Sequence, residues 1–338
     1  MVETSRARVL ALCLRRRMSE TVAPTVAPRE GIVVSGAGGV WRVRRDDGVA
    51  IDASLRGRLK QTRESALKLA VGDRVTIVPG DRGDGWAIDT ILPRRSQLAR
   101  REPGGRYGER IVVANIDQVV IVFAAANPEP HPRMLDRFLV IAEANNLHAR
   151  IVINKTELVG PGTAHARFDE YARVGYSVHF TSATMGMGLP ELHDALAGRT
   201  SAFSGPSGVG KSSLLNAMYP GLELRVGAIS ESVNKGRHTT VGAVLHPLPD
   251  GGYVVDTPGL REIGMWGVPV EHLDACFPEF RPFLEQCRFN DCSHQSEPEC
   301  AVREAVQMKT ISPERYDSYL RLYGELEATE QARSTSKR

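Results

Sequence analysis

The sequence predicts a multidomain α/β protein built from an N-terminal OB-like β-barrel, a parallel α/β domain and a mostly helical C-terminal domain. Five short β-type runs, separated by Gly, Asp and Pro, follow Gly31 and fit a small barrel. Strand and helix patterns then alternate, as they do in a parallel sheet with crossover helices. From about Val268 onward the pattern is mostly helical and surrounds a Cys/His cluster.

The length and composition are those of a globular protein of two or three domains. The chain has 338 residues, of which 42% are hydrophobic and 25% charged. No apolar run approaches the roughly 20 residues that a transmembrane helix needs. We expect a cytoplasmic monomer with no membrane partner. Residues 1–100 carry a net charge of +8 and the remainder −5, which indicates either an anionic partner for the first part or a solvated basic face.

The first hundred residues divide into two segments. Residues 1–28 lack periodicity and contain the run TVAPTVAP, so we expect a flexible basic arm, and Met18 is an alternative start to Met1. Residues 29–100 hold the runs GIVVS, VWRVRR, VAIDAS, DRVTIVP and GWAIDTIL. These favour an OB-fold, with an SH3-like barrel as the alternative. Residues 94–110 are basic and Gly-rich and are expected to be an exposed linker.

Residues 101–267 form the alternating domain, which contains a phosphate-loop pattern. The run from Gly205 to Ser212 matches G-x-x-x-x-G-K-[ST], between the short strand SAFS and the helix SSLLNAMYP. Its glycines allow backbone N–H groups to face phosphates, Lys211 can reach the β- and γ-phosphates, and Ser212 can ligate Mg²⁺. The expected phosphate-binding residues are Gly205, Pro206, Ser207, Gly208, Val209, Gly210, Lys211, Ser212 and Ser213.

Two further runs complete a magnesium and phosphate site. VVDTPG places Asp256 at the end of an apolar strand, as in the D-x-x-G loop of GTPases. Asp256 would hold Mg²⁺ through a water, and the N–H of Gly259 would meet the γ-phosphate. In the preceding run NKGRHTTVGA, Thr239 or Thr240 suits the switch threonine that caps Mg²⁺, and we favour Thr240.

Base recognition is expected from two loops that follow strands. NKTE resembles the N-K-x-D loop, whose carboxylate accepts hydrogen bonds from guanine N1–H and the exocyclic amine. Adenine has an acceptor at N1 and cannot donate this pair of hydrogen bonds. TSA fits the loop that supports guanine O6. Glu157 replaces the usual Asp, so guanine preference is expected with altered affinity. The residues are Asn154, Lys155, Thr156, Glu157, Ser182 and Ala183.

The order of these loops is rotated relative to an ordinary small GTPase, because the base-reading loops precede the phosphate loop. The chain is therefore expected to be a circularly permuted GTPase that uses GTP/GDP and Mg²⁺. Leu260 stands where many GTPases have the Gln that positions water, so intrinsic turnover should be low. His238 is either its substitute or a solvent-exposed switch residue. The expected catalytic residues are His238, Lys211 and Thr240.

A metal site is expected in the helical domain, residues 268–338. Cys287, Cys292, His294 and Cys300 have the spacing C-x4-C-x-H-x5-C. Three thiolates and an imidazole form a closed tetrahedral set, which favours one structural Zn²⁺; free thiols near a stray His are the alternative. Cys276 is expected to be a core thiol, and Cys13 lies in the arm.

Together the barrel, the permuted loops, GRHTT, DTPG and the Cys/His cluster resemble the bacterial small-ribosomal-subunit biogenesis GTPases over about residues 30–330. The resemblance implies a role in late maturation of the 30S subunit and GTP hydrolysis stimulated by that subunit. It also implies that the barrel and the zinc domain contact 16S rRNA, that hydrolysis times release, and that His238 is the family's histidine.

Two other functions compete with this reading. One is an RNA-binding or zinc module with a degenerate nucleotide pocket, against which the intact Lys211, Ser212 and Asp256 argue. The other is a small-molecule kinase on the same phosphate loop. It would leave the NKTE and TSA runs unexplained.

Overall fold

The computed structural model describes residues 28–60, 68–80, 85–101, 109–222, 224, 243–256 and 268–335. The arm expected at residues 1–28, apart from Pro28, lies outside these residues, as do His238, Thr240, Gly259 and Leu260. For Asp256 the structure describes the backbone.

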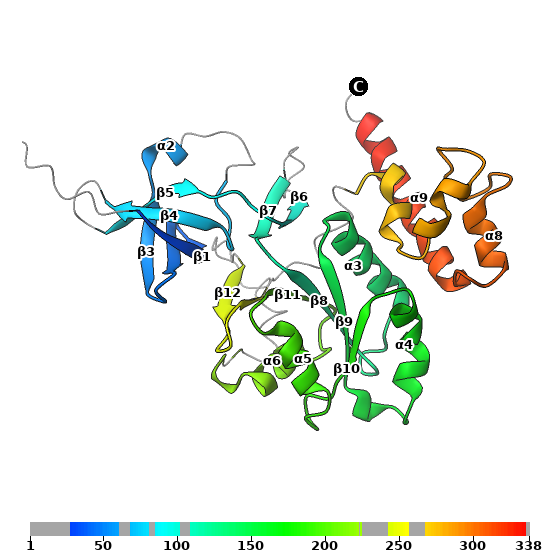
Figure 1. Cartoon of the computed structure of the whole chain (residues 1–338), viewed down its shortest axis with the longest axis horizontal. Coiled ribbons are helices and arrows are strands. Elements are labelled where there is room, and N and C mark those ends of the chain that lie inside the picture. The colour runs from blue at the N-terminus through cyan, green and yellow to red at the C-terminus, as the bar shows by residue number, and fades with distance from the viewer. Residues whose placement is uncertain are drawn as a thin grey trace, which may run out of the picture.

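The described chain begins with a closed five-stranded barrel (Figure 1). Its strands follow the order β1-β2-β3-β5-β4, in which β3 and β5 run parallel and β4 closes the barrel on β1. Val33, Val43 and Ile88 fill the interior with other apolar side chains from every strand. This confirms the OB-like prediction. The elements are β1 (Arg29–Ala37), β2 (Val40–Arg45), β3 (Ala50–Leu55), α2 (Gly57–Lys60), β4 (Arg74–Pro79) and β5 (Trp86–Ile91).

The prediction of an exposed linker at residues 94–110 was wrong in part, because this segment contributes to a two-stranded sheet. β6 (Gln97–Arg101) pairs antiparallel with β7 (Glu109–Ala114). Leu98, opposite Val113, is fully buried and belongs to the largest hydrophobic core. This strand is hard to predict from the sequence because the run from Arg94 to Arg110 is mostly arginine, glycine and polar residues. Its apolar residues are Leu98, Ala99, Pro103 and Tyr107.

The α/β domain is built on a six-stranded sheet of order β10-β9-β8-β11-β13-β12, with β12 antiparallel to the rest. Every residue of β8 is buried, because Val119 and Ile121 pack toward α3 and α4 while Val120 and Val122 pack toward α5 and α6. The strands are β8 (Gln118–Ala124), β9 (His148–Asn154), β10 (Ser177–Phe180), β11 (Thr200–Ser204), β12 (Val244–Pro247) and β13 (Tyr253–Asp256). The helices are α3 (Pro132–Ala144), α4 (Thr163–Arg173), α5 (Leu189–Leu196) and α6 (Lys211–Met218), with short 3₁₀ turns η2 (Thr156–Leu158) and η3 (Pro220–Leu222).

The strand order reverses between β8 and β11. Successive strands β8, β9 and β10 extend the sheet in one direction, whereas β11 lies on the other side of β8. In parallel sheets, ligands bind beyond the carboxyl ends of the strands at such a reversal. The loops after β9, β10 and β11 carry the predicted nucleotide-binding runs, so the fold brings them to one edge.

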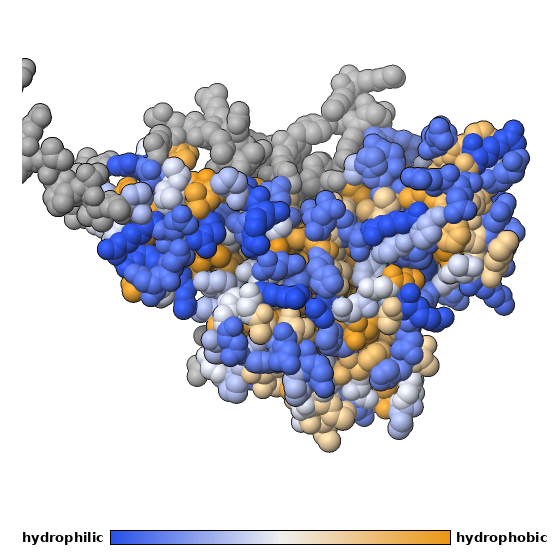
Figure 2. Space-filling view, in the orientation of Figure 1, coloured by the Kyte–Doolittle hydropathy of each residue, from blue (hydrophilic) through white to orange (hydrophobic). Residues whose placement is uncertain are grey.

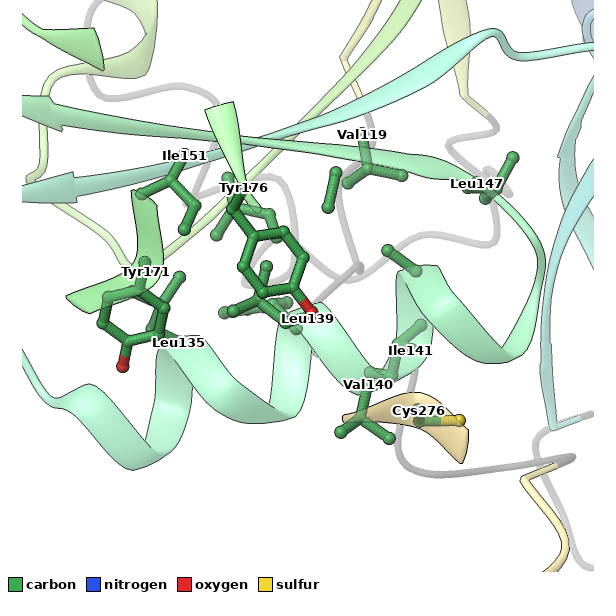
Figure 3. Packing of buried hydrophobic residues seen from close by; sticks show 14 of the residues in the cluster. Val119, Leu135, Leu139, Val140, Ile141, Leu147, Ile151, Tyr171, Tyr176 and Cys276 are labelled. Carbon is green, nitrogen blue, oxygen red and sulfur yellow. The ribbon is translucent and has the colours of Figure 1, made fainter. Parts of the chain in front are cut away.

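Helix α3 joins the sheet to the C-terminal domain. Pro132 occupies its first turn, where a missing N–H costs nothing. Figure 3 shows Leu135 beside Tyr171 and Leu139 near Tyr176, while Val140 lies beside Cys276 of the C-terminal domain. One hydrophobic core therefore continues from the sheet into the C-terminal domain, and Cys276 is buried in it as predicted.

The C-terminal domain is mostly helical, as predicted. Phe277, Phe280 and Tyr319 form its aromatic centre, with ring centroids 5.0–5.5 Å apart. Its elements are η5 (Val270–His272), η6 (Asp274–Cys276), η7 (Arg281–Gln286), α8 (Ala301–Gln307) and α9 (Pro313–Thr335).

Hydropathy varies over the visible surface and along the described helices. Figure 2 shows that hydrophilic residues cover most of the barrel in this view. Within the described ranges, none of the helices combines the length and hydrophobicity that crossing a bilayer requires.

Candidate active site and metal centre

The predicted phosphate loop lies between the carboxyl end of β11 and the start of α6. Gly205 has φ +129°, and a Cβ there would lie 2.0 Å from the carbonyl oxygen of Val122, so glycine is required. Gly208 and Gly210 also have positive φ. The first turn of α6 contains no acidic residue. The loop and the helix N-terminus thus present backbone N–H groups and a positive dipole end to an anion.

Lys211 begins α6 and folds back over this loop. Its Nζ donates hydrogen bonds to the carbonyl oxygens of Gly205, at 2.9 Å, and Pro206, at 2.7 Å. Ser212, the expected magnesium ligand, is buried. Asp256 ends β13 in register with Phe203 of the neighbouring β11, which places its backbone beside the strand that leads into the phosphate loop.

Asn154 connects the three loops at this edge of the sheet. It ends β9 and is 1% exposed. Its Nδ2 donates to the carbonyl oxygen of Val209 in the phosphate loop, at 2.9 Å. Its Oδ1 accepts from the backbone N–H of Ala183, at 3.2 Å, and from the hydroxyl of Thr181, at 3.3 Å. The base-reading loop is therefore fixed against both the phosphate loop and the TSA loop.

The rest of the base-reading loop is held by the same neighbours. Lys155 has φ +63°, and its Nζ donates to the carbonyl oxygen of Asn127 after β8. The hydroxyl of Thr156 donates to the carbonyl oxygen of Thr181, at 3.1 Å. Ser182 is fully buried. The backbone at residues 154–157 is thus positioned by contacts that do not involve a nucleotide.

Glu157 is held in its ionised form. Its Oε1 accepts a hydrogen bond from the hydroxyl of Thr184, at 3.1 Å. Burial raises the pKa of this carboxyl, but hydrogen bonds from Ser182, Thr184 and its own backbone N–H, with the charge of Lys155, outweigh burial and lower the pKa. An ionised carboxylate is the acceptor that guanine recognition needs.

Sequence reasoning did not single out Thr181, Thr184 and Asn127 as individual positioning residues. Thr181 is the first residue of the TSA run and Thr184 follows it, so these two hydroxyls were an available signal. Asn127 contributes a backbone carbonyl oxygen. No side-chain pattern could have revealed it.

The predicted metal ligands converge in the C-terminal domain. The ligand atoms of Cys287, Cys292, His294 and Cys300 all lie within 4.8 Å of one another. The Sγ atoms of Cys287 and Cys300 are 3.9 Å apart, and Nδ1 of His294 lies 3.6 Å and 3.4 Å from them. A tetrahedron with ordinary Zn–S and Zn–N bonds has edges of about 3.8 Å and 3.6 Å. The four side chains fit Zn²⁺.

The surroundings of this cluster also suit a cation. Nε2 of His294 lies 3.4 Å from Oδ2 of Asp274, so a carboxylate can fix the imidazole with Nδ1 toward the thiols. Burial raises the pKa of Cys292 to about 12, and burial also raises the pKa of Cys300. Thiols in this position favour the thiolate when a metal cation is bound.

The comparisons with known proteins agree with this geometry. The model of the RsgA GTPase family matches residues 91–266. The chain is 62% identical over 297 residues to a Gemmatimonas aurantiaca protein named small ribosomal subunit biogenesis GTPase RsgA, which covers 88% of this chain and 97% of the relative.

Two solved structures resemble the whole fold. YjeQ from Thermotoga maritima superimposes with a TM-score of 0.74 at 38% identity, covering 88% of this chain and 98% of that one. YloQ, described as a circularly permuted GTPase, gives a TM-score of 0.72 at 28% identity, covering 91% of this chain and 98% of that one. The rotated order of the predicted loops in this chain agrees with the description of YloQ as circularly permuted.

Proposed function

Because the chain belongs to the RsgA GTPase family and is a GTP-hydrolysing enzyme, we propose that it acts in late maturation of the small (30S) ribosomal subunit in the cytoplasm. The subunit would stimulate hydrolysis, the barrel and the zinc domain would contact 16S rRNA, and hydrolysis would time release. The net charge of +8 in residues 1–100 supports an RNA partner for the barrel.

The observation that carries the enzymatic part is the pair of contacts made by Asn154. Its Nδ2 is bonded to Val209 of the phosphate loop and its Oδ1 to Ala183 of the TSA loop. The base and phosphate subsites are therefore preformed at a fixed separation, which suits a guanine nucleotide bound across the edge of the sheet. Glu157, ionised, would accept from guanine N1–H and the exocyclic amine.

The phosphate subsite would then perform the chemistry. Backbone N–H groups of residues 205–213 and the ammonium of Lys211 would stabilise the charge that develops on the transferred phosphoryl group. Ser212, Thr240 and Asp256 would hold Mg²⁺, which neutralises phosphate charge when bound. His238 would orient the attacking water, since the aliphatic side chain of Leu260 cannot form a hydrogen bond with that water.

The two parts proposed to bind RNA adjoin the predicted switches in the sequence. β12 begins four residues after Thr240 and contacts β1 of the barrel, and Val34 of the barrel shares one core with Leu245 of β12. The C-terminal domain begins at Val268, nine residues after Gly259. A nucleotide-dependent movement of either switch would therefore reach the barrel or the zinc domain.

Co-sedimentation with 30S subunits tests this proposal. With a non-hydrolysable GTP analogue the protein should pellet with the subunit, and with GDP it should remain in the supernatant. Equal pelleting in both nucleotide states would contradict a hydrolysis-timed release. A failure to pellet in any state would remove the 30S partner and leave a GTPase with another target.

A further inference from the structure

We propose that a cleft between the α/β domain and the C-terminal domain binds the guanidinium or ammonium group of a basic protein segment. The cleft has a volume of about 500 Å³, within the range of ligand pockets. It lies where α3 and α4 face the first turns of α9, which packs beside α3 (Figure 1). Glu170 of α4 and Ser318 of α9 line it from opposite domains.

Ser318 is the first indication of a ligand. The side chain is 2% exposed, and its Oγ has no hydrogen-bond partner among the described residues. A serine inside a helix ordinarily bonds the carbonyl oxygen one turn earlier. A buried hydroxyl without a partner is costly. Ser318 is one of the residues that line the cleft, so a ligand bound there would lie next to this buried hydroxyl.

Glu170 is the second indication. Its Oε1 is buried, and in the described part of the chain it accepts no hydrogen bond. An ionised carboxylate oxygen withdrawn from water requires a donor, and a positively charged donor compensates it best. A single group with several N–H donors could satisfy both Ser318 Oγ and Glu170 Oε1.

The arginines of the cleft do not supply that donor, because each already has an acidic partner. Arg315 is almost completely buried and is the most central of them. The pairs are Arg315 with Asp136 and Glu279 (2.5 and 2.6 Å), Arg133 with Asp317 (3.1 Å), and Arg167 with Glu129 (2.8 Å). Among the described residues that line the cleft, Glu170 and Glu314 are left without an ion-pair partner, which favours a cation over a phosphate.

A protein side chain fits this chemistry better than RNA, since a backbone phosphate would meet the carboxylate of Glu170. A guanidinium carries five N–H donors and can bond a carboxylate and a hydroxyl together. Such a group would contact α4 and α9 at once. The occupant would therefore hold the α/β domain and the C-terminal domain in a fixed arrangement.

Fluorescence anisotropy of a labelled tetra-arginine peptide tests the site in the full-length protein. Glu170→Gln keeps the shape and removes the charge, so peptide affinity should fall at least about tenfold. Asp169→Asn is the matched control, because Asp169 is exposed on the same helix and does not line the cleft. It should change affinity less than about twofold.

Ser318→Ala separates ligand binding from structural support. Because its hydroxyl is unsatisfied, the variant should keep or raise the thermal midpoint of unfolding while peptide affinity falls several-fold. Equal losses in Glu170→Gln and Asp169→Asn would overturn the proposal, as would no peptide binding by the wild type. Binding of spermidine without the peptide, or Glu170-dependent binding of inorganic phosphate, would also overturn it.

Discussion

Nδ2 of Asn154 donates a hydrogen bond to the carbonyl oxygen of Val209, 2.9 Å away. The two residues are 55 positions apart and belong to the base-reading loop and the phosphate loop. In this permuted chain the contact joins a loop that comes early in the domain to one that comes late. The proposed nucleotide site therefore depends on the tertiary fold and not on the order of its loops.

Gly210→Ala should damage this contact. Gly210 has φ +94°, and a Cβ there would lie 2.4 Å from Nδ2 of Asn154. We expect a loss of at least about 1 kcal/mol in the free energy of unfolding and a marked loss of GDP affinity. Gly221→Ala is the control, since no atom of the described residues lies within 4 Å of its added Cβ. Urea unfolding and GDP titration measure both, and equal behaviour of the two variants would refute the packing argument.

The lowered pKa of Glu157 predicts how base recognition depends on pH. The pKa of Glu157 is below the ordinary glutamate value of about 4.3. As pH falls, the side chain therefore keeps its negative charge through that value and loses it only at lower pH. Glu157 should consequently contribute no change in GDP affinity between pH 8 and pH 5. Glu157→Gln should lose most of the preference for GDP over ADP at every pH. A decline in wild-type affinity that begins near pH 6 would exclude Glu157 as its source.

Asp274→Asn tests the support of the metal centre. Asp274 is the carboxylate that faces Nε2 of His294, and loss of such a partner typically weakens metal binding by about 10–100-fold. Competition with a zinc chelator measures the change. Asp291→Asn, at an exposed position beside Cys292, should leave zinc affinity unaltered. Wild-type protein that contains no zinc would contradict the assignment itself.

Asp136→Asn should destabilise the junction between the two domains. Asp136 and Arg315 are both 2% exposed at their side chains, and Tyr171 also donates to Asp136. Removing the charge leaves a buried guanidinium with Glu279 as its remaining acid, at a cost of about 3 kcal/mol. Asp317→Asn, which weakens exposed pairs with Arg133 and Arg321, should lower the thermal midpoint much less than Asp136→Asn does. Thermal unfolding distinguishes the two.

Apolar runs and short motifs in the sequence predicted individual strands, loops and helices. The apolar run of β8 and the Gly205–Ser212 pattern specify a buried strand and a strand–loop–helix, and the structure has both. Leu98 was missed because one buried residue in a basic segment has no periodicity.

Contacts between distant segments could not be predicted. Arg315 and Asp136 are 179 positions apart, and each is an ordinary charged residue on a helix until the domains meet. Thr184 likewise acquires its contact with Glu157 only when β9 and β10 pair. The convergence of Cys287, Cys292, His294 and Cys300 was predictable because the four residues lie within one short segment.

GTP hydrolysis by the purified protein, with and without 30S subunits and with ATP as the control, tests the central claim most directly. We expect slow hydrolysis by the protein alone, large stimulation by 30S that is specific to GTP, and loss of the stimulated rate in Lys211→Ala. Hydrolysis that 30S leaves unchanged would contradict the ribosomal assignment, and equal hydrolysis of ATP would contradict guanine recognition by Asn154 and Glu157.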